Sequence, residues 1–137
     1  LFEAFQTVGT ERKLIYHTNV MMSVGETFAI ICAESIDDKK ERKIVLDSLR
    51  GDEKEIILIT EEQVNNFAGN MLEVRGFDDK RYLVMSTSAY KSLTKKQIAQ
   101  IEEHVTILSS SLDTIEACGG GSARCMMAEI FLPKKQD

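Results

Sequence analysis

The sequence predicts an α+β fold of the α/β-propeller type, in which a strand–strand–helix–strand (ββαβ) unit is repeated. Two observations support this prediction. Asn19 and Asn70 are 51 residues apart, and so are Gly25 and Gly76. Each of the two stretches also contains the same succession of short apolar runs and one amphipathic segment. A period of about fifty residues with one supersecondary unit per repeat is typical of a propeller or a solenoid.

The first repeat unit covers residues 17–59. Two short apolar strands, at 19–22 and 28–32, read as a hairpin because turn-forming residues separate them. Residues 37–49 carry apolar side chains at helical spacing, which predicts a helix. A short buried strand is expected at 55–59.

Two capping boxes mark the starts of helices. In both Thr60–Gln63 and Thr94–Gln97, a threonine is followed three residues later by a glutamine, so each side chain can bond the other residue's backbone N–H. The first box predicts a short helix that ends before Gly69. The second predicts a helix with an apolar stripe between Ile98 and Val105.

The second repeat unit covers residues 70–109. Its hairpin strands are expected at 71–74 and 82–85, its helix behind the second capping box, and its last strand at 105–108. The two units therefore share one order of elements.

A third unit begins and does not finish, with final strands expected over residues 114–132. These are a strand at 114–117, a flexible break at Gly119–Gly121 and a strand at 125–132. Two units and a fraction leave sheet edges exposed, which proteins normally cover or pair. We therefore expect that an N-terminal half is missing or that a second chain, such as another copy in a homo-oligomer, covers these edges. The start at Leu1 rather than Met also predicts that something upstream is missing.

The composition is that of an ordinary globular domain, with 43% hydrophobic and 28% charged residues. A net charge of −5 argues against a nucleic-acid partner. No apolar run approaches the roughly 20 residues needed to span a membrane. The three cysteines are an odd number without framework-like spacing, which favours a reducing, cytoplasmic location. With only two histidines there is no zinc pattern, and we expect neither a metal nor an organic cofactor.

Cys125 is the strongest candidate for chemistry. It follows Gly119–Gly121, and backbone N–H groups freed by such a loop can bind a developing negative charge. The adjacent Arg124 favours a thiolate, although strand alternation would direct it to the opposite face. A small apolar residue at the start of a buried strand is an equally good interpretation. Cys118 and Cys32 are expected at strand positions in a structural role.

His17 is the second candidate, expected at the start of the first strand of the first unit. If the units are related by rotation, strand starts converge on one axis and bring His17 toward Cys125. A Cys–His pair supplies a nucleophile together with a proton donor and acceptor. Asn19 and Asn70 share one repeat position and are expected to line the same axis. The alternatives are a histidine that caps a strand and asparagines that serve turns, while His104 is interpreted as structural at a helix end.

The carboxylates are less informative. Glu116 and Glu129 flank the glycine loop, Glu26 lies in a turn, and Glu73 lies on a strand. Any of them could orient the histidine, but most acidic residues of a globular domain simply form a solvated face.

Residues 16–22 (Tyr-His-Thr-Asn-Val-Met-Met) and 119–127 (Gly-Gly-Gly-Ser-Ala-Arg-Cys-Met-Met) resemble the pentein superfamily of guanidino-group-modifying, amidinotransferase-like enzymes. The nearest resemblance is to bacterial citrulline utilization hydrolases, and it extends over nearly the whole chain. It implies a five-bladed propeller of ββαβ units. Residues 1–137 would form the C-terminal part of a single pentein domain, about two of the five blades.

The resemblance also implies a reaction. In arginine deiminase, dimethylarginine dimethylaminohydrolase and glycine amidinotransferase, a cysteine attacks the guanidino carbon and forms a covalent intermediate. A histidine protonates the leaving amine and then activates water or an incoming amine. By motif, Cys125 is the expected nucleophile and His17 the general acid/base. The expected substrate-binding residues are Asn19, Asn70, Arg124 and Gly121.

One departure from the family pattern concerns the substrate. Several relatives read His-x-Asp where this chain has His17 and Asn19. A carboxylate favours a cationic guanidinium, whereas an amide can bond a neutral group, so a ureido amino acid such as citrulline is favoured. The leading interpretation is a hydrolase of a C–N bond in a ureido or guanidino amino acid. Transfer of the group to a second amine, or a non-catalytic pentein-fold binding protein or fragment, are the alternatives.

Overall fold

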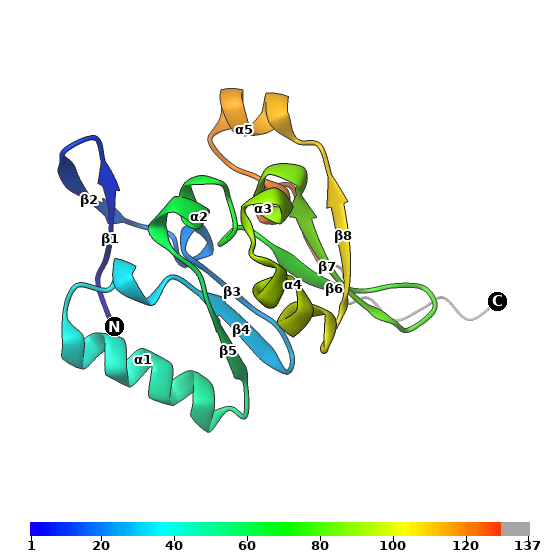
Figure 1. The fold of residues 1–137 in the computed structure, drawn as a ribbon, viewed down its shortest axis with the longest axis horizontal. Helices are drawn as coiled ribbons and strands as arrows, with labels where there is room; N and C mark the ends of the chain where they lie inside the picture. The colour runs from blue at the N-terminus through cyan, green and yellow to red at the C-terminus, as the bar shows by residue number, and fades with distance from the viewer. Residues whose placement is uncertain (130–137) are drawn as a thin grey trace.

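The computed structural model describes residues 1–129, which form an N-terminal hairpin and two three-stranded sheets (Figure 1). The hairpin pairs β1 (Ala4–Val8) with β2 (Glu11–Ile15) antiparallel. Its turn contains Gly9 with a φ of +65°, a conformation that glycine adopts without a steric penalty. This hairpin is not predicted above, although Gly9 between two potential strands is a signal for it.

The first unit consists of β3, β4, α1 and β5. Strand β4 pairs antiparallel with β3 and parallel with β5, so α1 is the crossover between parallel strands. Helix α1 begins after Asp38, whose carboxylate accepts hydrogen bonds from the backbone N–H groups of Lys40 and Glu41. The bounds are Met22–Val24 for β3, Phe28–Ile31 for β4, Lys39–Gly51 for α1 and Glu55–Leu58 for β5.

The second unit repeats this topology with β6, β7, α4 and β8. Strand β7 is antiparallel to β6 and parallel to β8, as β4 is to β3 and β5. The predicted repetition of a ββαβ unit is therefore confirmed. The unit also contains an unpredicted short helix, α3, which starts where the Ser86 hydroxyl accepts the Ala89 N–H. The bounds are Leu72–Arg75 for β6, Arg81–Ser86 for β7, Thr87–Ser92 for α3, Lys95–Glu102 for α4 and Thr106–Ser110 for β8.

Both predicted capping boxes are confirmed, at the start of α2 (Glu61–Asn65) and at the start of α4. Their glutamines also bond each other. Gln63 Nε2 lies 2.7 Å from Gln97 Oε1, and Gln97 Nε2 lies 3.0 Å from Gln63 Oε1. The residues that cap the two helices thus also join them.

The strands predicted near the C-terminus are wrong where the structure describes them. Residues 114–117 lie in helix α5 (Asp113–Gly119), which ends at Gly120 in the left-handed conformation with φ +66°. The glycine run is therefore a helix stop rather than a break between strands. The strand predicted at 125–132 begins instead within the single helical turn α6 (Ala123–Met126). The last three residues of that prediction lie outside the described part of the chain.

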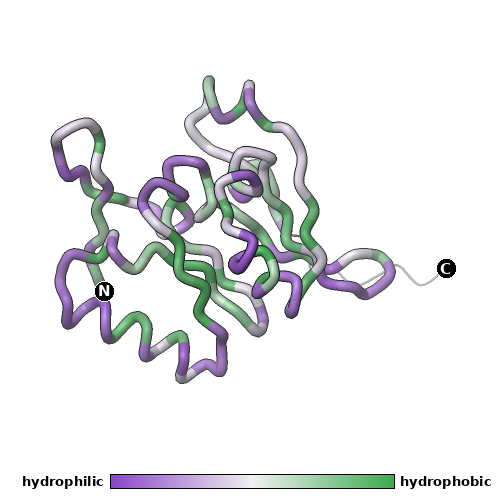
Figure 2. Tube along the Cα trace, viewed as in Figure 1, coloured by the Kyte–Doolittle hydropathy of each residue, from purple (hydrophilic) through white to green (hydrophobic). Residues whose placement is uncertain are grey.

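The core lies on and between the two sheets. All residues of β4 are fully buried, and the neighbouring strands β4 and β5 are mostly hydrophobic, whereas α1 alternates polar and apolar residues (Figure 2). Helix α4 contacts both β5 of the first unit and β8 of its own, with Ile101 fully buried. The two units therefore share one hydrophobic core. Within the described residues, no helix has the length and hydropathy of a membrane span.

Candidate active site

Cys125 lies in α6 and is held by Asn70, a residue of the second unit that is only 4% exposed. The Asn70 Oδ1 atom accepts the Cys125 N–H at 3.4 Å, and Asn70 Nδ2 lies 3.2 Å from Cys125 Sγ. The Asn70 carbonyl also accepts the Arg124 N–H at 3.4 Å. Asn70 thus bonds the second and third N–H groups of α6, a role that the residue before a helix usually fills. The N–H groups of Arg124 and Cys125 are therefore already bonded, and the expectation that the glycine loop provides N–H groups for a developing negative charge stays a prediction.

Asn19, the equivalent residue of the first unit, reaches the same sulfur. Its Nδ2 atom lies 3.8 Å from Cys125 Sγ, and its carbonyl accepts a hydrogen bond from Asn70 Nδ2 at 2.9 Å. Two asparagines 51 residues apart therefore converge on one thiol. This is the arrangement expected if equivalent positions of the two units face a common axis.

Each asparagine is placed by a tight turn. Thr18–Val20 form one 3₁₀ turn, in which the His17 carbonyl accepts the Val20 N–H at 3.1 Å. The strand predicted to begin at His17 therefore starts only at Met22, because this turn uses the intervening backbone groups. The Asn70 N–H donates to the Phe67 carbonyl at 2.9 Å, and Phe67 has a φ of 64°. A bulky residue rarely adopts that left-handed conformation, and such strain is concentrated at functional sites.

The glycine loop lies directly against the cysteine. A Cβ added to Gly121 would meet Cys125 Cβ at 3.0 Å and Sγ at 3.2 Å. A side chain at this position would crowd the sulfur, so glycine keeps the space beside Cys125 open.

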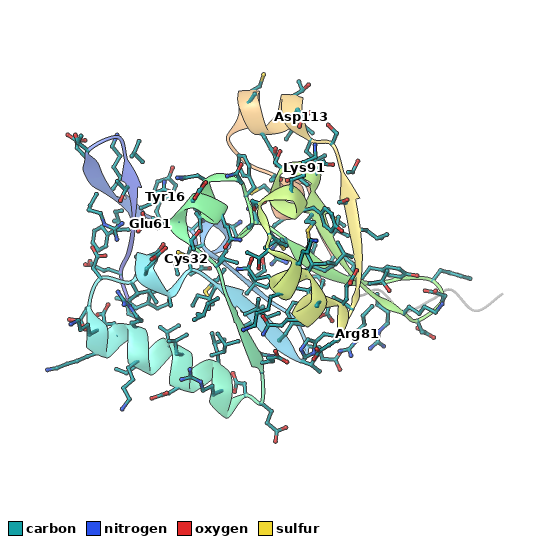
Figure 3. All side chains as sticks on the ribbon, in the orientation of Figure 1. Tyr16, Cys32, Glu61, Arg81, Lys91 and Asp113 are labelled. Carbon is teal, nitrogen blue, oxygen red and sulfur yellow. The ribbon has the colours of Figure 1, made fainter. Side chains whose placement is uncertain are left out.

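A cavity of about 290 Å³ opens beside Cys125. The hairpin with Leu14 and the adjoining Tyr16 form one wall, and the segment around α2 forms another, with Val64 and Phe67; Tyr16 is labelled in Figure 3. The residues that line it are apolar or carry neutral polar groups, and none of those described is charged. The hairpin wall was not predicted from the sequence.

Of the six predicted site residues, only Cys125 and Asn70 line this cavity, whereas His17, Asn19, Gly121 and Arg124 do not. His17 is exposed and packs edge-on against Tyr16, with ring centroids 5.2 Å apart, but it does not line the cavity. Arg124 is also exposed, and it lines a separate cavity of about 210 Å³ together with Asn19. Their predicted roles in catalysis and substrate binding stay predictions.

The three cysteines differ in environment, and all are free thiols. Cys32 is fully buried at the end of β4, and burial raises the pKa of its thiol. Cys118 is exposed on α5, where the sequence predicted a strand. Within residues 1–129, no group of three or more His, Cys, Asp or Glu side chains is arranged to hold a metal ion.

The repeated ββαβ units, with a cysteine held between equivalent asparagines, define a protein with a pentein-like α+β fold. The structure resembles that of ArgZ, an arginine dihydrolase from the ornithine–ammonia cycle in cyanobacteria, in its apo form, with a TM-score of 0.61 and 16% sequence identity. The similarity covers 81% of this chain and 16% of the ArgZ chain. At this identity it shows the fold alone.

A sequence model of the eukaryotic N,N dimethylarginine dimethylhydrolase family matches residues 2–132. The chain belongs to this family. A search among curated protein sequences found no significant match.

Proposed function

We propose that the full-length protein is a hydrolase that cleaves a C–N bond of a guanidino or ureido amino acid through a covalent intermediate on Cys125. The family is named for hydrolysis of dimethylarginine, and ArgZ is named as an arginine dihydrolase. The observation that carries the proposal is an exposed thiol with the amides of Asn70 and Asn19 directed at its sulfur. Amide donors bond most strongly to an anionic acceptor, and the thiolate is the nucleophilic form of cysteine.

In the proposed reaction, the Cys125 thiolate attacks the central carbon of the guanidino or ureido group. A C–S bond forms, the C–N bond to the leaving amine breaks, and His17 gives a proton to that nitrogen. Water then attacks the same carbon, transfers a proton to His17 and releases the sulfur. With citrulline the products are ornithine and carbamic acid, which decomposes to carbon dioxide and ammonia. The assignment of His17 is supported by its place in the sequence. The preceding residue, Tyr16, lines the cavity, and Asn19, two residues later, reaches the sulfur.

A neutral ureido group suits the described part of the site best. Asn19 stands where several relatives have an aspartate, and the described cavity lining provides no carboxylate. A cationic guanidinium would therefore need a counter-charge from residues that do not line this cavity. The narrower resemblance to citrulline utilization hydrolases is part of this proposal.

We also propose that the two units are two of five propeller blades in the full-length protein. Their identical topology and the convergence of Asn19 and Asn70 on one point support this arrangement. The chain spans 16% of ArgZ, so further blades, from the same protein or from a second chain, would complete the cavity.

The proposal is tested by turnover of dimethylarginine, arginine and citrulline in the full-length protein and in Cys125→Ser. We expect the variant to lose all turnover, while Cys118→Ser, which removes another exposed thiol, retains it. Labelling with a small electrophilic amidine should modify Cys125 before the other cysteines, and the preferred substrate should protect it. Turnover by Cys125→Ser would overturn the proposed nucleophile. Product formed only when a second amine is added would indicate a transferase instead.

A further inference from the structure

The side chain of Glu116 is buried, although it belongs to a surface helix. It lies on α5, whose start is marked by Asp113 in Figure 3, and it is only 9% exposed. Buried carboxylates normally have a charged or hydrogen-bonding partner, because their transfer from water is costly. Within residues 1–129, no Lys, Arg or His forms an ion pair with it. Its partners are two hydroxyls: Ser122 donates to Oε1 at 2.6 Å and Ser88 donates to Oε2 at 2.9 Å.

Ser122 connects this carboxylate to the cysteine. It is fully buried, directly precedes α6, and its carbonyl accepts the Cys125 N–H at 3.1 Å. A serine at this position usually caps the helix with its own side chain. Here it makes no such bond; its hydroxyl donates to Glu116, and Asn70 accepts the N–H groups of Arg124 and Cys125.

Asn70 holds α6 from the Cys125 side, but the glycine loop that precedes α6 has little to fix its own conformation. Residues 119–121 are all glycine, which has the greatest conformational freedom of any residue. Ser122 is the first residue after them with a side chain, and that side chain is bonded to Glu116. Through Ser88, the same carboxylate is also bonded to α3 of the second unit.

We propose that Glu116 is a positioning residue for Cys125. Its carboxylate joins the loop to α3, fixes the start of α6 and so holds the sulfur against the amides of Asn70 and Asn19. This inference rests on the proposed role of Cys125 as the nucleophile. The sequence pointed to Glu116 only as one of several carboxylates that could orient the histidine or form a solvated face.

The test measures the rate at which a small electrophile alkylates Cys125, together with kcat and KM, in full-length Glu116→Ala and Glu116→Gln. Misplacement of a reacting group by about 1 Å can cost about 100-fold in rate, so we expect Glu116→Ala to lower both kcat and the alkylation rate by about tenfold to 100-fold. KM should change little, because Glu116 does not line the cavity. Glu116→Gln keeps one acceptor oxygen and should recover part of the loss. Glu102→Ala, an exposed glutamate on α4, is the matched control.

Ser122→Ala and Ser88→Ala separate positioning from general stability. Ser122→Ala should reproduce most of the loss, and Ser88→Ala a smaller part. If Glu116→Ala does not fold, these two serine variants test the proposal in its place. Wild-type alkylation and kcat in Ser122→Ala, or a loss in Ser88→Ala alone, would overturn the proposal. Alkylation does not need a substrate, so failure of the proposed function would appear separately, as a reactive Cys125 without turnover.

Discussion

The two ββαβ units have the same topology but hold their equivalent asparagines differently. Asn70 of the second unit is almost fully buried and bonds Cys125 through both its side-chain oxygen and its nitrogen. Asn19 of the first unit is half-buried and reaches the sulfur only at 3.8 Å. The second unit is the one packed against the glycine loop and α6. A repeated backbone therefore sets where a residue lies, whereas the neighbours of each unit set how firmly it is held.

The two units also resemble each other in their β3–β4 and β6–β7 turns but differ in the packing of their helices. A Cβ on Gly25 would meet the Phe28 ring at 2.7 Å, and one on Gly76 would meet the Tyr82 ring at 2.7 Å, so equivalent glycines pack on equivalent aromatic rings. The helices differ, because α4 packs between the units whereas α1 lies at one side of the first sheet (Figure 1).

The largest effect is expected where the two asparagine turns touch. A Cβ on Gly69 would lie 2.2 Å from the Val20 carbonyl oxygen, and this backbone atom cannot rotate away. We expect Gly69→Ala to lower the free energy of unfolding by about 3 kcal/mol or more, measured by urea denaturation. Gly51→Ala, in α1 with nothing within 4 Å of the added carbon, is the control and should be neutral or slightly stabilising. Equal effects of the two substitutions would contradict the close contact.

The next prediction tests the difference between the asparagines directly. We expect Asn70→Ala to lower the alkylation rate of Cys125 and kcat by about 100-fold, and Asn19→Ala by about tenfold, because only Asn70 holds both the sulfur and the backbone of Cys125. Asn66→Ala, which removes an exposed amide bonded to the Glu62 carbonyl, should leave both rates unchanged. A larger loss in Asn19→Ala would reverse the comparison.

A smaller effect is expected at the paired glutamines. Gln63 Nε2 donates to the Ser92 carbonyl and to Gln97, so Gln63→Glu replaces a donor by an acceptor that faces two acceptors. The loss in unfolding free energy should be about 1–3 kcal/mol, because Gln63 is buried and its partners are left unsatisfied. Gln97→Glu should cost less, since Gln97 is partly exposed. Additive losses in the double variant would indicate that the pair does not couple α2 to α4.

The smallest effect concerns the segments that precede each unit, the hairpin and α2. Arg12 of the hairpin bonds Asp37 and Glu61, and Glu61 also accepts the Thr7 N–H at 3.1 Å. Burial alone would raise the pKa of Glu61, but the hydrogen bonds from Arg12 and Thr7 outweigh it and hold this pKa below the ordinary value of 4.5. The ionised carboxylate therefore adds stability above about pH 4.5 that is lost as the pH falls through the folded-state pKa.

Wild type should therefore exceed Glu61→Gln in stability at neutral pH by a small margin, because the ion pair is partly exposed. This margin should disappear in acid, as measured by unfolding midpoints across the pH range. A margin that stays constant with pH would show that the Glu61 charge does not secure the hairpin.

Much of the fold could be predicted because it is encoded locally. The strands of both units and the helices α1 and α4 follow from apolar periodicity, although α3 does not, and the capping boxes at Thr60 and Thr94 are found as expected. The errors arose where a short pattern fits two structures. Residues 114–117 alternate as a strand would, but the glycines behind them stop a helix.

The site was predicted in part. The repeat spacing placed Asn19 and Asn70 together, because symmetry-related positions in repeated units face common points. No sequence signal distinguishes Glu116 from the other acidic residues, since its burial depends on Ser88 and Ser122 from separate segments.

The sequence by itself determined the repeated unit, the helix caps and the candidate nucleophile, because periodicity, capping and motifs act over a few neighbouring residues. Only the tertiary structure decided that Asn70 rather than Ser122 caps α6, that the hairpin forms a wall of the cavity and that Glu116 is buried. Each of these depends on groups far apart in the chain. Their hydrogen bonds and burial exist only after the two units, the hairpin and the glycine loop have packed together.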